Sequence, residues 1–80
     1  MAFVSAISKD DRDFRSLHPT EVECRYLVAE RDGKKILQLN TYGSVKRDIP
    51  DKLSQTLQFD EQAAADLFEL LVQEFGFSKK

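Results

Sequence analysis

The chain has 80 residues, a formal net charge of −2 and 41% hydrophobic residues. This length supports one small domain over residues 1–80, and the weak acidity argues against a strongly basic nucleic-acid binder. With one cysteine, Cys24, and one histidine, the sequence excludes an intrachain disulfide and a zinc site, so we expect no metal and no cofactor. Since no apolar run reaches membrane-spanning length and the first residues lack a signal-peptide pattern, we expect a cytoplasmic protein without membrane contact.

The first 20 residues carry the weakest structural signals. Phe3, Val4 and Ile7 favour an edge strand, and residues 14–17 favour a further short strand before His18 and Pro19. The aspartates within residues 10–13 could hold a divalent cation, but no glycine and distant acid complete a calcium loop, which favours a solvated turn. His18 has no nucleophile near it in sequence, so a surface or capping role is expected.

Strong alternation of apolar and polar residues predicts a β-hairpin in the middle of the chain. Val22, Cys24, Tyr26 and Val28 alternate with their neighbours, which indicates a strand over about residues 21–31. Asp32–Gly33 then favours a two-residue turn, because both positions tolerate positive φ. The returning strand is expected over residues 34–42, and the polar, proline-containing stretch 44–52 is expected to lie outside the core.

A third strand and a helix are expected in the last third of the chain. Leu53, Leu57 and Phe59 lie on one side of an alternating strand over residues 53–59. Asp60 then fits a helix N-cap, and Gly76 fits the left-handed residue that ends the helix. The expected fold class is therefore α+β: an antiparallel sheet of three to five strands with one C-terminal helix, residues 60–76, packed on one face.

The predicted helix has two neighbouring apolar stripes, which is more than one sheet face needs. We expect the stripe of Ala64, Phe68, Leu71 and Phe75 to face the sheet. The second stripe is either part of a well-buried core helix or the contact with a partner chain, and a domain without metal or disulfide gains stability by forming a homodimer. The expected core contains Leu37, Leu39, Leu57, Phe59, Phe68 and Leu71, and the candidate dimer residues are Ala63, Leu67 and Leu70.

The opposite face of the predicted sheet carries a run of polar side chains. Gln38, Asn40 and Tyr42 share this face and are expected beside Ser54, Thr56 and Gln58. Bases of single-stranded DNA or RNA would stack on the tyrosine, amides would contact base edges and basic residues would contact phosphates. A solvated face without a role is the alternative. The candidate binding residues are Arg25, Lys34, Lys35, Gln38, Asn40, Tyr42, Lys46, Arg47, Lys52, Thr56 and Gln58.

Two stretches, "RYLVAERDGKKILQLNTY" and "IPDKLSQTLQFDEQAAADLFELL", resemble the positive-cofactor-four family of transcriptional coactivators and its bacterial relatives. The resemblance covers about residues 25–71 and implies a dimeric single-stranded-DNA-binding protein with a curved antiparallel sheet and a C-terminal helix. The matching positions are Arg25–Tyr26, Gly33–Lys34, Tyr42, Pro50, Lys52 and Glu61–Gln62.

The sequence contains no catalytic signature, so we do not expect an enzyme. The favoured function is binding of single-stranded nucleic acid in transcription or DNA maintenance, on the polar sheet face. Two alternatives stay open: a protein-interaction or regulatory module with no nucleic-acid binding, and a small accessory subunit of an enzyme.

Overall fold

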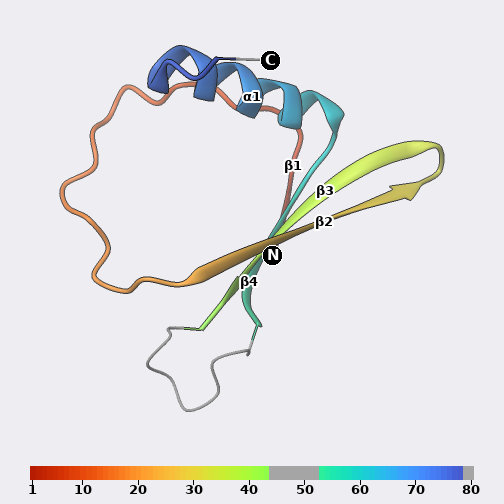
Figure 1. Cartoon of the computed structure of the whole chain (residues 1–80), viewed down its shortest axis with the longest axis horizontal. Helices are drawn as coiled ribbons and strands as arrows, with labels where there is room; N and C mark the ends of the chain where they lie inside the picture. Colours follow the sequence, from red (N-terminus) through yellow and green to blue (C-terminus); the bar gives the residue numbers. More distant parts are fainter. Residues whose placement is uncertain (44–52, 79–80) are drawn as a thin grey trace.

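The computed structural model describes residues 1–43 and 53–78, which form a four-stranded sheet and one helix (Figure 1). The strands are β1 (Ala2–Val4), β2 (Glu23–Arg31), β3 (Lys34–Tyr42) and β4 (Leu53–Phe59), and the helix is α1 (Glu61–Phe75). In the sheet the strands follow the order β1-β4-β3-β2. The predicted α+β fold class, with one C-terminal helix, is confirmed.

The hairpin of β2 and β3 forms where the alternation predicts it. The two strands pair antiparallel from Glu23 opposite Tyr42 to Arg31 opposite Lys34. Asp32 and Gly33 have φ values of 54° and 75°, the left-handed values that a two-residue hairpin turn requires at both central positions. This turn joins the strands without a gap in the ladder, and it fixes which side chains share a face.

The remaining strands extend the sheet from the other side of β3. Strand β4 pairs antiparallel with β3, with Leu37 opposite Phe59, and the register shifts next to Tyr42 as in a β-bulge. Strand β1 pairs with β4 in parallel, with Phe3 opposite Gln58. The sheet is therefore mixed, and the expectation of a wholly antiparallel sheet was wrong for β1.

The segment between β1 and β2 makes the parallel pairing possible. It runs beside α1 and then follows a wide arc to the start of β2 (Figure 1), so that β2 runs in the same direction as β1. The backbone N–H of Ile7 donates to Asp66 Oδ2 at 3.0 Å, and Lys9 Nζ lies 3.7 Å from Glu74 Oε2. The strand predicted over residues 14–17 is absent, because this segment lies in the exposed arc and pairs with no other strand.

Helix α1 begins and ends at the predicted residues. The carboxylate of Asp60 accepts a hydrogen bond from the backbone N–H of Ala63 at 2.9 Å, as expected of an N-cap. Gly76 adopts φ 72°, and its N–H donates to the carbonyl of Val72 at 3.0 Å. No helix within residues 1–43 and 53–78 is long and apolar enough to cross a membrane.

The expected core forms only in part. Phe59 is 6% exposed, and Leu37, Leu39 and Leu71 are half-buried. Leu57 and Phe68 were expected in the core but are 42% and 45% exposed. The reason is that α1 stands away from most of the sheet (Figure 1) and contacts only parts of β3 and β4.

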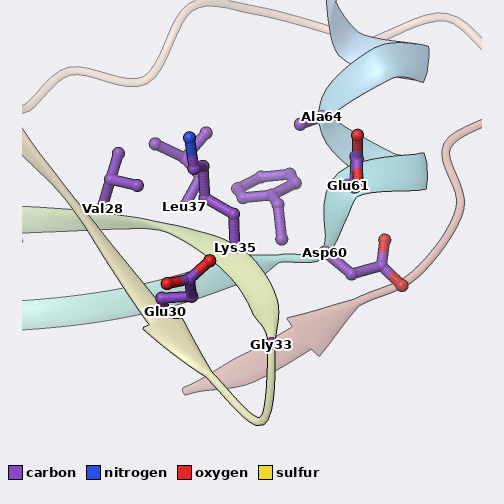
Figure 2. A pocket seen from close by; sticks show the side chains of 9 residues that line it. Val28, Glu30, Gly33, Lys35, Leu37, Asp60, Glu61 and Ala64 are labelled. Atoms are coloured by element: carbon purple, nitrogen blue, oxygen red, sulfur yellow. The ribbon is translucent and has the colours of Figure 1, made fainter.

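A hollow of about 350 Å³ separates the hairpin from the start of α1. In Figure 2, Ala64 and Glu61 of α1 face Val28 and Leu37 of the hairpin across it. Apolar residues therefore line the helix side of the sheet, and the helix does not fully cover them.

The two stripes of α1 are not divided between the sheet and a partner chain in the way expected. Ala63 is 0% exposed, so its own chain encloses it, and its assignment to a partner interface is corrected. Leu67 and Leu70 are half-buried, and Leu70 shares a hollow with Ile7 of the segment after β1. Phe68 and Phe75 of the other stripe are 45% and 67% exposed. Periodicity could not separate the stripes because both are apolar.

Candidate nucleic-acid interface

One face of the sheet points away from α1, and no helix of the described chain lies over it. The strand registers place on this face the predicted residues Arg25, Gln38, Asn40, Thr56 and Gln58. Arg25 lies opposite Asn40 on β3, and Asn40 lies opposite Thr56 on β4. We call this surface, completed by Tyr42, the open face.

The amide and hydroxyl side chains of the open face bond to one another. Gln58 Nε2 donates to Gln38 Oε1 at 2.8 Å, and Gln38 Nε2 donates to Asn40 Oδ1 at 2.9 Å. The Thr56 hydroxyl donates to the same Asn40 oxygen at 3.1 Å. These four residues form a row of hydrogen bonds that crosses β3 and β4, which we call the amide row.

The two ends of the amide row differ in their access to solvent. Asn40 and Thr56 are only 6% and 5% exposed, and their contacts within the chain hold the row in place. Gln58 is half-buried, and its Oε1 accepts no hydrogen bond from the described residues. Gln58 is therefore the residue of the row whose amide a ligand can reach. Asn40 instead holds the side chains of Gln38 and Thr56 in place.

A stacked pair lies next to the buried end of the amide row. The guanidinium carbon of Arg25 lies 4.4 Å from the centre of the Tyr42 ring, a cation–π contact. The same guanidinium donates to Glu23 Oε1 at 3.0 Å, which orients it and offsets part of its charge. The pair brings together an aromatic ring and a guanidinium, the two kinds of group on which nucleic-acid bases stack.

The predicted basic residues do not all lie on the open face. Lys34 borders a hollow on this face, whereas Lys35 borders the hollow on the helix side, so Lys35 is corrected to the opposite face. Successive residues of a strand point to opposite sides, which explains the separation of these neighbours. Lys46, Arg47 and Lys52 lie outside the described residues, as does the side chain of Ser54.

An apolar part of the open face near the hairpin turn was not expected from the sequence. Phe3, Leu27 and Ile36 line a hollow there together with Arg31 and Gln38. Extending the alternation of β2 and β3 would have placed Leu27 and Ile36 on this face. The sequence favoured an edge strand at Phe3 but did not show its partner or its face, because these depend on the parallel pairing of β1 with a strand far along the chain.

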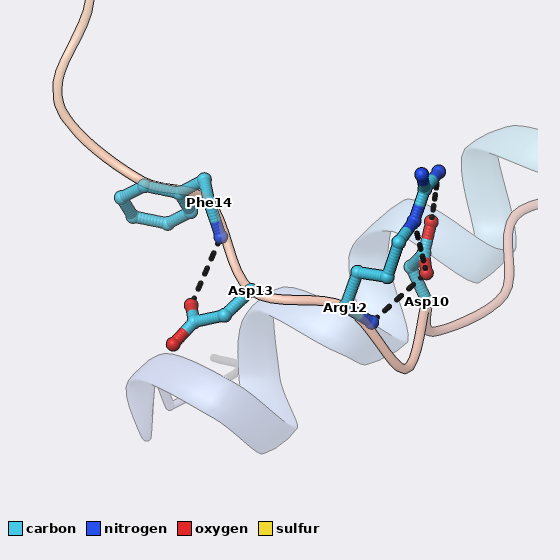
Figure 3. Close-up of polar contacts among 4 residues, drawn as sticks. All are labelled: Asp10, Arg12, Asp13 and Phe14. Carbon is cyan, nitrogen blue, oxygen red and sulfur yellow. Dashed lines mark hydrogen bonds and ion pairs between the residues drawn. The ribbon is translucent and has the colours of Figure 1, made fainter.

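The acidic turn near the N-terminus is held by its own side chains. Asp10 accepts from the backbone N–H of Arg12 at 3.0 Å and from its guanidinium at 3.5 Å, and the Phe14 N–H donates to Asp13 (Figure 3). The Arg12 backbone N–H and guanidinium hold the pKa of Asp10 below its ordinary value. The described residues contain no group of ligands suited to a metal ion.

His18 has the local role that its position predicts. Its Nδ1 accepts a hydrogen bond from the backbone N–H of Thr20 at 3.2 Å, and the residue is exposed. It thus caps a turn in the arc before β2.

No protein-family model, curated protein or solved structure matches this chain. The resemblance to the positive-cofactor-four family therefore stays a prediction, and the candidate interface is defined by its own geometry.

Proposed function

We propose that this protein binds single-stranded nucleic acid on the open face of its sheet. The observation that carries the proposal is the amide row beside the stacked Arg25–Tyr42 pair, on a face that no described helix covers. A regulatory role in transcription or DNA maintenance would follow from the family resemblance.

The chemistry of the open face suits unpaired bases better than a duplex. Bases in a single strand expose their flat surfaces for stacking and their edges for hydrogen bonds, and the Tyr42 and Arg25 pair offers a surface for the first. Gln58 offers an amide for the second, while Lys34 at the hairpin end supplies a charge for phosphate. We expect the protein to prefer single strands to duplexes. We expect no strong preference for one base sequence, because every base can stack.

Lys34 and Lys35 provide a matched pair for testing the proposed face. Both are exposed lysines at the same end of β3, and both border a small hollow at the start of α1. They differ in that Lys34 also borders the hollow on the open face, whereas Lys35 borders the larger hollow on the helix side. A labelled 12-residue oligothymidylate would be titrated at several salt concentrations and followed by fluorescence anisotropy. We expect Lys34→Gln to weaken binding and to lower the salt slope by about 0.7, the value for one lost contact with a single strand.

The control variant Lys35→Gln should bind with the affinity and salt slope of the wild type. An equal effect of both substitutions would contradict the assignment of binding to the open face. If the wild type shows no salt-sensitive binding at tens of micromolar, nucleic acid is excluded and a protein partner becomes the better explanation.

The aromatic part of the open face calls for a separate test. Tyr42→Ala should weaken oligothymidylate binding by about 1–3 kcal/mol, because it removes a stacking surface. The salt slope should stay unchanged, since no phosphate contact is lost. Unchanged affinity in the Tyr42→Ala protein would exclude Tyr42 as a stacking surface.

We also infer that a second copy of the chain covers the helix side of the sheet. A compact monomer of 9.2 kDa exposes about 4,900 Å², whereas this chain exposes 7269 Å². The arc before β2 contributes to the excess, and so do apolar residues on the helix side. The part of this excess that lies on the helix side is the area that a two-fold dimer would bury.

The exposed apolar residues of the helix side support this inference. Tyr26 and Val28 of β2 are 72% and 52% exposed, and Leu57 of β4 is 42% exposed, on the face that α1 covers only in part. Phe68 of α1 is 45% exposed. A two-fold dimer that buried these residues would complete the core and leave the open face accessible.

A further inference from the structure

A second hollow, of about 420 Å³, lies on the open face beside the hairpin turn. We call it the hairpin-end hollow. Its residues come from β1, β2, β3, β4 and the turn, so the whole width of the sheet contributes to it. It lies beyond the Gln58 end of the amide row, away from the Arg25–Tyr42 pair.

Three large apolar residues line the hairpin-end hollow. Phe3 is 56% exposed and Leu27 is 47% exposed, on the two outer strands, and Gln58 and Gln38 lie between them in the same row of the sheet. Ile36 lies two residues nearer the hairpin turn and is half-buried.

Phe3 is held by the parallel ladder, in which it lies opposite Gln58, and the N–H of Asp60 donates to the carbonyl of Val4 at 3.3 Å. The backbone thus holds an exposed aromatic residue at the edge of a hollow of about 420 Å³.

The polar groups around these apolar residues are arranged asymmetrically. On one side, Gln58 presents the amide oxygen that accepts no hydrogen bond from the described residues, and Gln38 lies next to it in the amide row. On the other side, Arg31 and Lys34 provide two positive charges against the single negative charge of Asp32. None of the ion pairs among the described residues involves Arg31 or Lys34.

We propose that the hairpin-end hollow is a base-binding subsite, in which one base of a single strand stacks on Phe3, bonds to Gln58 and places its phosphate near Arg31 and Lys34. The subsite rests on the proposed function and extends it, because it adds a second stacking position to the one at Tyr42. A base satisfies all three features of the hollow together: a flat apolar surface, an edge with donors and acceptors, and an attached anion.

The two stacking positions lie far enough apart to take different bases of one strand. Phe3 on β1 is level with Gln38 on β3, which is four residues from Tyr42. The two positions are therefore offset by about 13 Å along the strands and by two strand spacings across the sheet. A nucleic-acid strand bound at both positions would cross β4 diagonally, from β1 to β3, over the amide row.

The absence of tryptophan from the chain allows a direct test. In a Phe3→Trp variant the new indole would be the one tryptophan of the protein, and a base stacked on it should quench its emission during titration with 12-residue oligothymidylate. Phe14→Trp provides the matched control, because Phe14 is 77% exposed and lies in the arc before β2, away from the hollow. Its emission should stay unchanged.

The affinity for oligothymidylate provides a second test of the subsite. Phe3→Ala should weaken oligothymidylate binding by about 5- to 150-fold, the loss found when a stacking residue is removed. Phe14→Ala should bind as the wild type does. Circular dichroism of each variant would show that β1 and the rest of the sheet keep their structure.

The outcomes separate this proposal from the broader one. If the wild type binds the oligonucleotide but Phe3→Trp is not quenched and Phe3→Ala keeps full affinity, the subsite is wrong while binding on the open face stands. If the wild type does not bind at all, both are wrong. Quenching at position 3 together with weaker binding of Phe3→Ala would establish the subsite.

Discussion

Asn40 has a structural role in this protein that its type and position would not suggest. It is 6% exposed, and its side-chain oxygen accepts hydrogen bonds from both Gln38 and Thr56. Replacing it with alanine would leave the buried Thr56 hydroxyl without its acceptor. We expect Asn40→Ala to lower the free energy of unfolding by about 1–3 kcal/mol, measured by urea denaturation.

Gln38 offers a comparison within the same row. It is half-buried rather than buried, so water can replace the bonds that it loses. We expect Gln38→Ala to cost about 0.5–1.5 kcal/mol, less than Asn40→Ala. Equal costs, or no cost at Asn40, would show that the amide row does not stabilise the sheet.

At the level of elements, the orientation of α1 is the feature that most needs a test. Ala63 is 0% exposed, whereas Ala65, two residues later, is exposed. A larger side chain at position 63 must push the helix away from the chain that encloses it. We expect Ala63→Leu to lower the free energy of unfolding by about 1–3 kcal/mol through overpacking.

The same substitution at position 65 serves as the control. Ala65→Leu points to solvent and should change the free energy of unfolding by less than about 0.5 kcal/mol. If the two variants were equally stable, the helix would be turned differently from the arrangement described above.

Elements that depend on local signals were predictable from the sequence, and those that depend on distant pairing were not. Asp32 and Gly33 determine the hairpin turn, and Asp60 and Gly76 determine the ends of α1, because each acts through the backbone of its immediate neighbours. The parallel pairing of β1 with β4 has no such signal, since about 55 residues separate the partners.

In the candidate site, too, local features were predictable from the sequence and contacts between distant residues were not. Alternation along β3 predicted that Gln38, Asn40 and Tyr42 share a face, but it could not show that the amides bond to one another. It also could not show that Asn40 would be enclosed by longer neighbours, because burial depends on which side chains the adjacent strands supply.

At the scale of the whole molecule, the proposed dimer makes a prediction about mass. Sedimentation at micromolar concentration should give twice the 9.2 kDa of one chain. Val28→Asp would place a charge among the exposed apolar residues of the helix side, where Val28 is 52% exposed. We expect this variant to sediment as a monomer, because burying an unpaired carboxylate opposes association.

Phe14→Asp is the matched control for the effect of an added charge. Phe14 is more exposed than Val28 and lies in the arc rather than on the sheet, so its replacement should leave the dimer intact. A wild-type protein that sediments as a monomer at micromolar concentration would contradict the dimer.

The parallel pairing of β1 has a consequence for the order in which the protein folds. The β2–β3 hairpin and α1 close short loops, whereas β1 must wait for β4, and bringing its partner close costs the entropy of closing a loop of about 55 residues. With three residues, β1 is also the shortest strand and is expected to detach most readily in the native state. Since Phe3 belongs to it, any molecule that binds at the hairpin-end hollow would select the fully closed sheet and slow its opening. Binding of the ligand would then be coupled to the pairing of β1 with β4, and each would stabilise the other.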